Sequence, residues 1–299
     1  MVDDFRCGYI ALVGRPNVGK STLLNRILGQ KISITSRRPQ TTRHRVLGIK
    51  TLSSAQLIYV DTPGIHEFGG RAMNRHMNRT ASSVLSEVDI VVFLVDVKRW
   101  TTDDDLVLRK LGQLQCPVVL AVNKIDLLDS RDELLPALQT LSGKRAFEQI
   151  IPISAGKGDN VPALESCIEA LLPVAHPMFP KDQVTDRSVR FLAAELVREK
   201  LFRKLGKELP YGLPVEIEEF RSEPKITHIH ALIWVERKSQ KIIVIGKQGR
   251  VLKETGIEAR KDIEVLIDGK VNLKLWVKVK EGWADDERAL RSLGYDHEG

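Results

Sequence analysis

The sequence carries a glycine-rich segment at residues 14–21 (GRPNVGKS), whose residue types and spacing suit phosphate binding. It follows an apolar run at 9–13 and precedes a helix-like segment at 22–28. G-x-x-x-x-G-K-[ST] between a strand and a helix is typical of a P-loop, whose glycines let backbone N–H groups turn toward phosphate oxygens. The positive end of the new helix faces the same anion. We expect Lys20 to reach the β- and γ-phosphates and the Ser21 hydroxyl to ligate Mg²⁺.

A second motif, residues 61–64 (DTPG), ends the apolar run at 57–60. Asp61 at a strand tip can hold Mg²⁺ through water, and the Gly64 N–H can bind a γ-phosphate and move when that phosphate leaves. By itself this tetrapeptide is an ordinary turn. Behind a P-loop it predicts the rest of a phosphate and magnesium site.

Residues 123–126 (NKID) indicate which base is bound. A carboxylate accepts two neighbouring donors, and guanine offers N1–H and N2–H₂ on one edge. Adenine lacks this pair and would leave the Asp126 carboxylate unpaired, so the motif favours GTP over ATP. We expect Asn123 to tie neighbouring loops together and the Lys124 stem to cover the ring face. After the next apolar run, we expect the Ala155 N–H to meet guanine O6 and Ser154 to shape the loop.

The segment 33–45 is long, polar and basic. One interpretation is a plain surface loop. The other is a switch, in which a threonine hydroxyl meets Mg²⁺ only when the γ-phosphate is present. We favour Thr42 for this role and keep Thr41 as the alternative.

The first half of the chain alternates apolar, strand-like runs with helical patterns such as those at 75–85, 103–114 and 161–172. This alternation predicts an α/β domain over residues 1–173, with a mostly parallel sheet covered by helices on both faces. Ligands bind at the carboxyl ends of such strands, where the motifs lie. Residues 174–186 are proline-rich, which predicts an extended, semi-rigid linker.

The second half, residues 187–299, has a different pattern that predicts an α+β domain. Residues 187–205 carry an apolar helical stripe. The expected strands are 214–220, 227–236, 241–245 and 271–279.

Positive charge is concentrated in this second domain. The window 225–280 holds 13 Lys/Arg and 6 Asp/Glu, a net charge of +7 that equals the formal charge of the whole chain. Within it, residues 246–249 (GKQG) match the GXXG loop of a KH domain, which clamps about four nucleotides. A lone G-x-x-G is usually a plain turn, but in a basic window it predicts RNA binding. The expected RNA-binding residues are Ile245, Gly246, Lys247, Gln248, Gly249, Arg250 and Lys253.

Composition narrows the class of protein further. The chain has 299 residues, of which 42% are apolar and 28% charged, as in ordinary globular proteins. Its three cysteines have neither metal-site nor disulfide spacing and suit a reducing cytosol. The amino terminus lacks a signal-peptide pattern, and the most apolar stretch, 90–97, is too short for a transmembrane helix. We expect a cytoplasmic protein.

Taken together, the motifs resemble those of the Era family of GTPases. The first domain matches in order and spacing at GRPNVGKS, QTTRHR, DTPG, NKID and the Ser-Ala loop. The second matches at VIGKQG, GIEARKD and WVKVKEGWADDERALRSLGY. The resemblance implies a P-loop GTPase domain followed by a type II KH domain, and Mg²⁺-dependent GTP hydrolysis. It also implies binding to the 3′ region of small-subunit ribosomal RNA and a role in assembly and maturation of the 30S subunit.

The resemblance has four further implications. Ile65 stands where Ras-like enzymes have a water-orienting glutamine, so intrinsic turnover should be slow. Asn17 matches the asparagine that, in related GTPases, helps hold a potassium ion in place of an arginine finger. The family associates peripherally with the cytoplasmic face of the inner membrane, which the basic surface permits. We expect a monomer.

The expected site residues follow from these motifs. Those for GTP or GDP are Gly14, Asn17, Val18, Gly19, Lys20, Ser21, Thr22, Asp61, Gly64, Asn123, Lys124, Asp126, Ser154 and Ala155. The expected magnesium ligands are Ser21, Thr42 and Asp61. The expected catalytic residues are Asn17, Lys20, Thr42 and Gly64. The alternative function is a GTPase that assists tRNA modification or membrane traffic, with the basic domain as a docking surface only.

Overall fold

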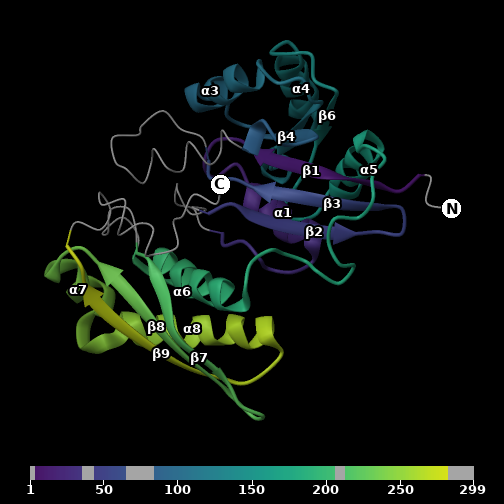
Figure 1. Ribbon diagram of the computed structural model, residues 1–299. Helices are drawn as coiled ribbons and strands as arrows, with labels where there is room; N and C mark the ends of the chain where they lie inside the picture. Colours follow the sequence, from purple (N-terminus) through teal and green to yellow (C-terminus); the bar gives the residue numbers. More distant parts are fainter. Residues whose placement is uncertain (1–3, 36–43, 65–83, 206–212, 282–299) are drawn as a thin grey trace. The chain divides into compact units, whose positions relative to one another are not determined.

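The structure is a computed structural model of the chain, and it describes residues 4–35, 44–64, 84–205 and 213–281. Contacts divide the chain into two units, the first built mostly from residues up to Asp186 and the second mostly from Arg187 onward. Figure 1 labels the helices and strands of both units. Within the described ranges, no helix has both the length and the apolar character needed to span a bilayer.

The first unit is organised around a sheet with the strand order β2-β3-β1-β4-β5-β6. The strands are β1 (Arg6–Val13), β2 (Val46–Thr51), β3 (Ala55–Asp61), β4 (Ile90–Asp96), β5 (Val118–Asn123) and β6 (Gln149–Pro152). Only the edge pair β2–β3 is antiparallel among these strands; every other neighbouring pair is parallel. The predicted, mostly parallel α/β sheet is therefore confirmed.

The register of the strands brings the motifs to one edge of the sheet. Leu12 of β1 lies beside Asp61 of β3, and Asp96 of β4 lies beside Asn123 of β5. Because these strands run in the same direction, the P-loop, the DTPG segment and the NKID segment all begin at the carboxyl edge. The sheet thus positions the nucleotide motifs before any side chain is considered.

Helices surround this sheet. They are α1 (Lys20–Leu28), α3 (Thr102–Leu111), α4 (Leu134–Ser142) and α5 (Val161–Leu171). Single 3₁₀ turns lie at Ile125–Leu127 and Arg131–Glu133. The helices expected at 103–114 and 161–172 are confirmed as α3 and α5, and the one expected at 75–85 lies mostly outside the described residues. Helix α4 is not among the helices expected from the sequence.

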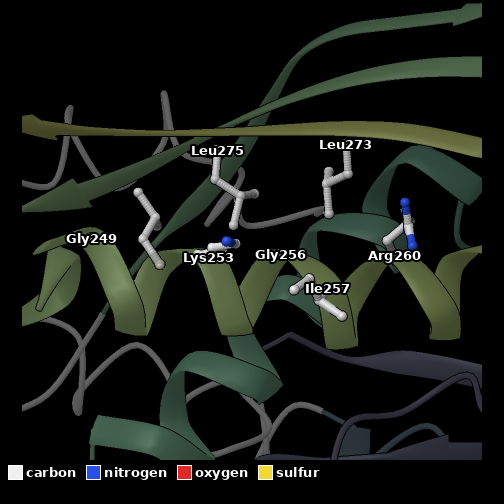
Figure 2. A pocket seen from close by; sticks show the side chains of 8 residues that line it. Gly249, Lys253, Gly256, Ile257, Arg260, Leu273 and Leu275 are labelled. Carbon is white, nitrogen blue, oxygen red and sulfur yellow. The ribbon is translucent and has the colours of Figure 1, made fainter.

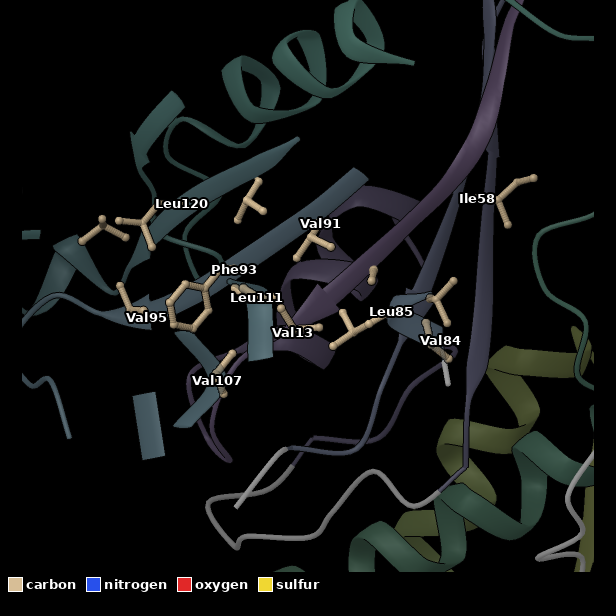
Figure 3. Packing of buried hydrophobic residues seen from close by; sticks show 14 of the residues in the cluster. Val13, Ile58, Val84, Leu85, Val91, Phe93, Val95, Val107, Leu111 and Leu120 are labelled. Carbon is tan, nitrogen blue, oxygen red and sulfur yellow. The ribbon is translucent and has the colours of Figure 1, made fainter. Parts of the chain in front are cut away.

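The core of the first unit explains why its strands read as continuous apolar runs. Phe93 of β4 is fully buried and packs toward Val107 and Leu111 of α3 (Figure 3). The strand neighbours of Phe93, Val92 and Leu94, are also fully buried, although their side chains point to the opposite face. Burial on both faces is what a helix-covered parallel sheet requires.

Residues 174–186 are held along the first unit by hydrogen bonds. The Gln56 amide donates to the Phe179 carbonyl (2.8 Å) and accepts the Phe179 N–H (2.9 Å). The Ile49 N–H of β2 donates to the Val184 carbonyl (2.8 Å). The segment contains a turn, in which the Gln183 N–H donates to the Pro180 carbonyl (3.1 Å), and it belongs to the first unit, where these hydrogen bonds hold it along strands of the sheet.

The second unit has the element order α-β-β-α-α-β. Its elements are α6 (Val189–Leu205), β7 (Val215–Ser222), β8 (Thr227–Val235), α7 (Lys238–Ile245), a 3₁₀ turn (Lys247–Gly249), α8 (Arg250–Ile267) and β9 (Val271–Val279). The sheet order is β7-β8-β9, with β7–β8 antiparallel and β8–β9 parallel. This arrangement confirms the α+β class.

One expected strand, 241–245, is wrong: these residues form the second half of α7. The run of β-branched residues suggested a strand, but Gln240 Oε1 accepts the N–H groups of Glu236 (2.8 Å) and Arg237 (3.0 Å) and so caps a helix. Val244 is buried whereas Ile242 is 72% exposed, so the run is buried on one side only. The GKQG turn is therefore flanked by helices on both sides.

Candidate nucleotide site and nucleic-acid interface

The P-loop adopts backbone conformations that favour glycine and asparagine. Gly14 and Gly19 have φ of +150° and +108°, and Asn17 has φ of +65°. A Cβ added to Gly14 would lie 2.4 Å from the Leu94 carbonyl oxygen, and one on Gly19 would lie 2.3 Å from Asn123 Nδ2. The first and last glycines of the motif are therefore needed for close packing as well as for backbone freedom.

The first turn of α1 follows this loop. Gly19 is its N-cap without a side-chain cap, and its first turn, which includes Thr22, contains no acidic residue. Val18 is fully buried beneath the loop. A helix N-terminus presented in this way attracts an anion through its backbone N–H groups.

The Lys20 ammonium is enclosed by the same loop. Lys20 Nζ donates to the carbonyl oxygens of Gly14 (2.8 Å) and Arg15 (3.0 Å). Burial lowers the pKa of Lys20 to about 8, although the charge of Asp61 opposes this shift. A cation that has already lost most of its water gains strongly from a phosphate oxygen placed beside it.

The expected magnesium ligands form a compact set of oxygen atoms. The hydroxyls of Ser21 and Ser33 each donate to Asp61 Oδ2 at 2.7 Å. Asp61 Oδ1 is buried and has no hydrogen-bond partner in the part of the chain that the structure describes. Burial raises the pKa of Asp61, while the two serine hydroxyls and Lys20 favour its ionised form. Hard oxygen donors around an under-coordinated carboxylate fit Mg²⁺ with bound water. Sequence reasoning did not identify Ser33.

Gly64 lies against the P-loop, whereas the contact of its N–H with a γ-phosphate remains a prediction. A Cβ added to Gly64 would approach Pro16 N to 2.8 Å. Thr62 Oγ1 donates to the Leu12 carbonyl (3.0 Å) and anchors the DTPG segment to β1. Thr42 and Ile65 lie outside the described residues, so the assigned switch threonine remains a prediction.

Asn123 joins three loops through its side chain. Its Nδ2 donates to the Val18 carbonyl (2.7 Å), and its Oδ1 accepts the N–H groups of Lys124 (2.8 Å) and Ala155 (2.9 Å). This geometry agrees with the tying role expected for Asn123. It differs from the expectation for Ala155, whose N–H was assigned to guanine O6, because the Asn123 carbonyl already accepts that N–H.

The carboxylate assigned to guanine is oriented by a serine. Ser154 Oγ donates to Asp126 Oδ1 at 2.6 Å, a more direct role than the loop shaping expected of it. Lys124 has φ of +68°, and its ammonium lies 2.7 Å from Asp96 Oδ2. That ion pair fixes the direction of the Lys124 stem.

A further ion-pair network holds the P-loop, and sequence reasoning missed it. Arg15 Nε donates to Asp104 Oδ2 (3.0 Å), and Arg15 Nη2 donates to the Arg99 carbonyl (3.2 Å) and lies 3.9 Å from Asp96 Oδ2. Asp104 is fully buried in the first turn of α3. Burial raises the pKa of Asp104, and Arg15 and Thr101 oppose the shift. Asp96 therefore lies close to cations of both the phosphate loop and the base-recognition loop.

The GKQG turn links α7 to α8 in the second unit. Gly246, Gln248 and Gly249 have φ of +73°, +52° and +76°. A Cβ on Gly246 would lie 2.4 Å from Val251 Cγ2, whereas one on Gly249 would have no atom within 4 Å. Gly246 is therefore required for packing. Gly249 leaves open space in which a ligand backbone can approach.

A groove of about 390 Å³ begins at this turn and runs between α8 and β9. It is lined by Gly249, Leu252, Lys253, Gly256, Ile257, Arg260, Leu273 and Leu275. Figure 2 shows Leu273 and Leu275 pointing from β9 toward α8. Its floor is apolar and its charges are cationic.

Two of the expected RNA-binding residues, Gly249 and Lys253, line this groove. The other five, Ile245, Gly246, Lys247, Gln248 and Arg250, form the end of α7, the turn and the start of α8. Sequence reasoning missed the apolar floor. The strict alternation of β9 was the signal for it, because that pattern places Leu273 and Leu275 on one face.

Two family models match the chain. One is described as a 50S ribosome-binding GTPase and covers residues 9–124. The other is described as a KH domain and covers residues 208–284. Their order confirms a GTPase domain followed by a KH domain.

Relatives match almost the whole chain. A GTPase Era from Pseudomonas aeruginosa (strain LESB58) is 60% identical over 97% of this chain and 95% of its own. One from Pseudomonas syringae pv. tomato is 60% identical over 97% of both.

Two solved structures are similar over both domains. One is Era in complex with MgGDPNP and nucleotides 1506–1542 of 16S ribosomal RNA, and the other is a variant of Aquifex aeolicus Era bound to GDP.AlF4⁻. Each has a TM-score of 0.94 and 39% identity, over 97% of this chain and 99% of its own. The chain therefore belongs to the family of the GTPase Era, and it is a GTPase with a KH domain as its second part.

Proposed function

We propose that this protein is a GTP-driven RNA-binding switch that binds the 3′ region of small-subunit ribosomal RNA and acts in assembly and maturation of the 30S subunit. The single observation that carries the proposal is the presence of two sites in one chain: a P-loop pocket with guanine-reading groups, and a KH groove. The relative of TM-score 0.94 that was crystallised with MgGDPNP and 16S nucleotides supports joint use of the two sites.

The choice between the two ribosomal subunits depends on how much of the chain each match covers. The family model that names the 50S subunit matches residues 9–124 and so stops within the GTPase domain. The relative with 16S nucleotides matches 97% of the chain, including the KH domain. Because the KH domain is the part that contacts RNA in proteins of this kind, we favour the small subunit.

Each part of the pocket has a defined task in this proposal. Lys20 and the α1 N-terminus bind the phosphates, Ser21 and Asp61 hold Mg²⁺, and Asp126 reads guanine. Mg²⁺ supplies electrostatic stabilisation of the phosphates when bound. With an apolar residue at position 65, no side chain there aims the attacking water, so hydrolysis is slow. A potassium ion at Asn17 would raise the rate.

Crosslinking to RNA in the GTP and GDP states tests the proposal. We expect crosslinks to the 3′ end of 16S ribosomal RNA that are stronger with a non-hydrolysable GTP analogue than with GDP. A variant with Lys247→Asp and Gln248→Asp should lose them. Lys225→Asp, which changes an exposed lysine at the β7–β8 turn, is the charge control. Equal crosslinking in both nucleotide states, or an unaffected double variant, contradicts the proposal.

We further propose that the protein is a monomer and reaches the cytoplasmic face of the inner membrane peripherally, through its basic second domain. Attraction of a basic surface to anionic lipids supports this. Flotation with vesicles that contain anionic lipid, compared with neutral vesicles, tests the association, and loss of the difference at high salt is the expected result. Light scattering tests the monomer.

A further inference from the structure

The open face of the second sheet carries an unusual set of side chains. β9 is an edge strand of the order β7-β8-β9. Leu273 and Leu275 face α8 and line the groove, so the residues between and after them, Lys274 and Trp276, point to the opposite face of the sheet. Groove and open face are therefore separated by the width of one strand.

Trp276 is the aromatic centre of this face. Its side chain is 54% exposed, although tryptophan is among the residues most often covered in folded proteins. Lys274 and Lys278 lie two residues before and two residues after it on the same side of β9, and both are exposed. We call Lys274, Trp276 and Lys278 the lysine–tryptophan face.

The neighbouring tryptophan has a different environment. Trp234 of β8 lies opposite Lys278 in the sheet register. The ammonium groups of Lys278 and Lys280 lie 5.9 and 5.7 Å from its ring centre, and its Nε1 donates to Glu216 (3.0 Å). Two lysine ammonium groups thus lie over the Trp234 ring, whereas the Trp276 side chain is more than half exposed.

The positive charge of this face is concentrated at its β9 edge. Among residues 271–280 the charged residues are lysines, without an acid. Glu218 of β7 pairs with Lys278 at 3.0 Å, but both partners are about half exposed, and such surface pairs are weak. A phosphate group can displace this carboxylate at little cost. The edge next to the groove therefore favours a polyanion.

We propose that the lysine–tryptophan face binds the continuation of the RNA strand that occupies the KH groove. A KH groove clamps about four nucleotides, so a longer strand must leave it. A strand that crosses the β9 edge meets Trp276, on which a base stacks, while Lys274 and Lys278 contact phosphates on either side. Cations around an exposed ring are the usual pattern of sequence-tolerant single-strand binding. This inference rests on the proposed RNA-binding function and extends its site.

Two RNA lengths separate the face from the groove. One probe is a groove-length oligonucleotide of about four nucleotides from the 3′ end of 16S ribosomal RNA. The other is about 12 nucleotides long and contains the first. Trp276→Ala should weaken binding of the longer probe about tenfold and leave binding of the shorter one unchanged, because only the longer strand reaches Trp276 and stacks a base on it.

Conservative and matched variants test whether the weaker RNA binding of Trp276→Ala comes from a disturbed fold. Trp276→Phe keeps an aromatic face and should restore most of the affinity for the longer probe. Lys274→Glu should weaken the longer probe selectively, whereas Lys225→Glu, the matched control, should not. Val265→Ala removes an exposed apolar side chain from α8 and should affect neither probe. Added 12-nucleotide RNA should quench tryptophan fluorescence more in the wild type than in Trp276→Phe.

The possible failures are distinguishable. Equal affinities of Trp276→Ala and wild type for both probes overturn the inference and leave the groove intact. If Trp276→Ala weakens binding of both probes equally, the inference is overturned too, because Trp276 then affects the groove itself. Loss of association with a 30S protein, with RNA binding unaffected, assigns the face to a protein partner and contradicts the proposal. If the wild type binds neither probe, the proposed function fails together with the inference.

Discussion

The nucleotide pocket and the KH groove achieve recognition by opposite means. In the pocket, several polar side chains are buried and already hydrogen-bonded: Asn123 bonds three loops, and Ser154 orients the half-buried Asp126. In the groove, the floor is apolar and Lys253 and Arg260 stand at its sides (Figure 2). The pocket is therefore preorganised for one ligand, a guanine nucleotide. The groove binds through its shape and its positive charge, which depend less on the identity of each base.

This difference predicts different sensitivities to substitution. A buried polar group that loses its partner costs free energy without compensation from water, so single changes in the pocket should have large effects. In the groove, the affinity for RNA is the sum of many weak contacts with exposed cations and an aliphatic floor. Single substitutions there should therefore have small effects on RNA affinity.

The largest effect is expected at the phosphates. Lys20→Ala removes a buried cation, which should weaken GTP and GDP binding about a thousandfold because several charge-assisted hydrogen bonds are lost together. Titration with a fluorescent guanine nucleotide measures it. Lys181→Ala, at an exposed lysine of the same unit, is the control. A loss below about tenfold would mean that the phosphates are held elsewhere.

The next largest effect is expected at the base. Asp126→Asn replaces a carboxylate acceptor with an amide, which should weaken GTP binding about a hundredfold. The variant should gain tight binding of xanthosine triphosphate, because xanthine has a carbonyl acceptor where guanine has an amino group. Competition between the two nucleotides measures the switch. Retained preference for GTP would reject the assignment of Asp126 to guanine.

The pocket should also respond to pH through Lys20. Burial lowers the pKa of Lys20 to about 8, and a bound phosphate raises it again. Nucleotide binding above about pH 8 therefore takes up a proton: the affinity is constant below that pH and falls up to tenfold per pH unit above it. Calorimetry at pH 9 in two buffers of different ionisation enthalpy measures the uptake. Lys20→Arg, which does not titrate there, should show none.

A more moderate effect is expected at Arg15, which links the P-loop to Asp104 and to the Arg99 carbonyl. Arg15→Ala leaves the buried Asp104 carboxylate without its cation and loosens the P-loop, so GTP and GDP should bind about tenfold more weakly. The ratio of GTP to xanthosine triphosphate affinity should not change, because the base loop keeps Asp126. A shift in that ratio would show that Arg15 acts on the base as well.

How much the sequence could predict differs between the same two regions. The P-loop, DTPG and NKID motifs are local, and the parallel sheet brings them to one edge, so the place of these three motifs in the fold was predictable, whereas the contact of Ser33 with Asp61 was not. The Arg15–Asp104 pair was not, because its members lie 89 positions apart and no motif links them. In the KH domain the GKQG turn was local and predictable. The groove floor depends on how β9 packs on α8.

The misassigned strand at 241–245 has the same cause. Its β-branched residues favour a strand locally, but the helix cap at Gln240 and the one-sided burial of the run decide for α7. Intrinsic preference is a weak guide where a short segment must join a sheet to a turn.

The smallest effect tests whether the groove acts through its shape. Gly256 lies inside α8, and a Cβ there would contact Leu275 Cδ1 at an ordinary 3.5 Å. Gly256→Ala should therefore stabilise the domain against unfolding, by about 0.5–1 kcal/mol, because glycine is unfavourable within a helix. The same methyl group narrows the groove and should weaken RNA binding about threefold. Thermal unfolding and RNA titration measure the two effects. Opposite signs identify a steric groove, whereas unchanged RNA affinity would place the RNA above the floor, in contact with the exposed lysines alone.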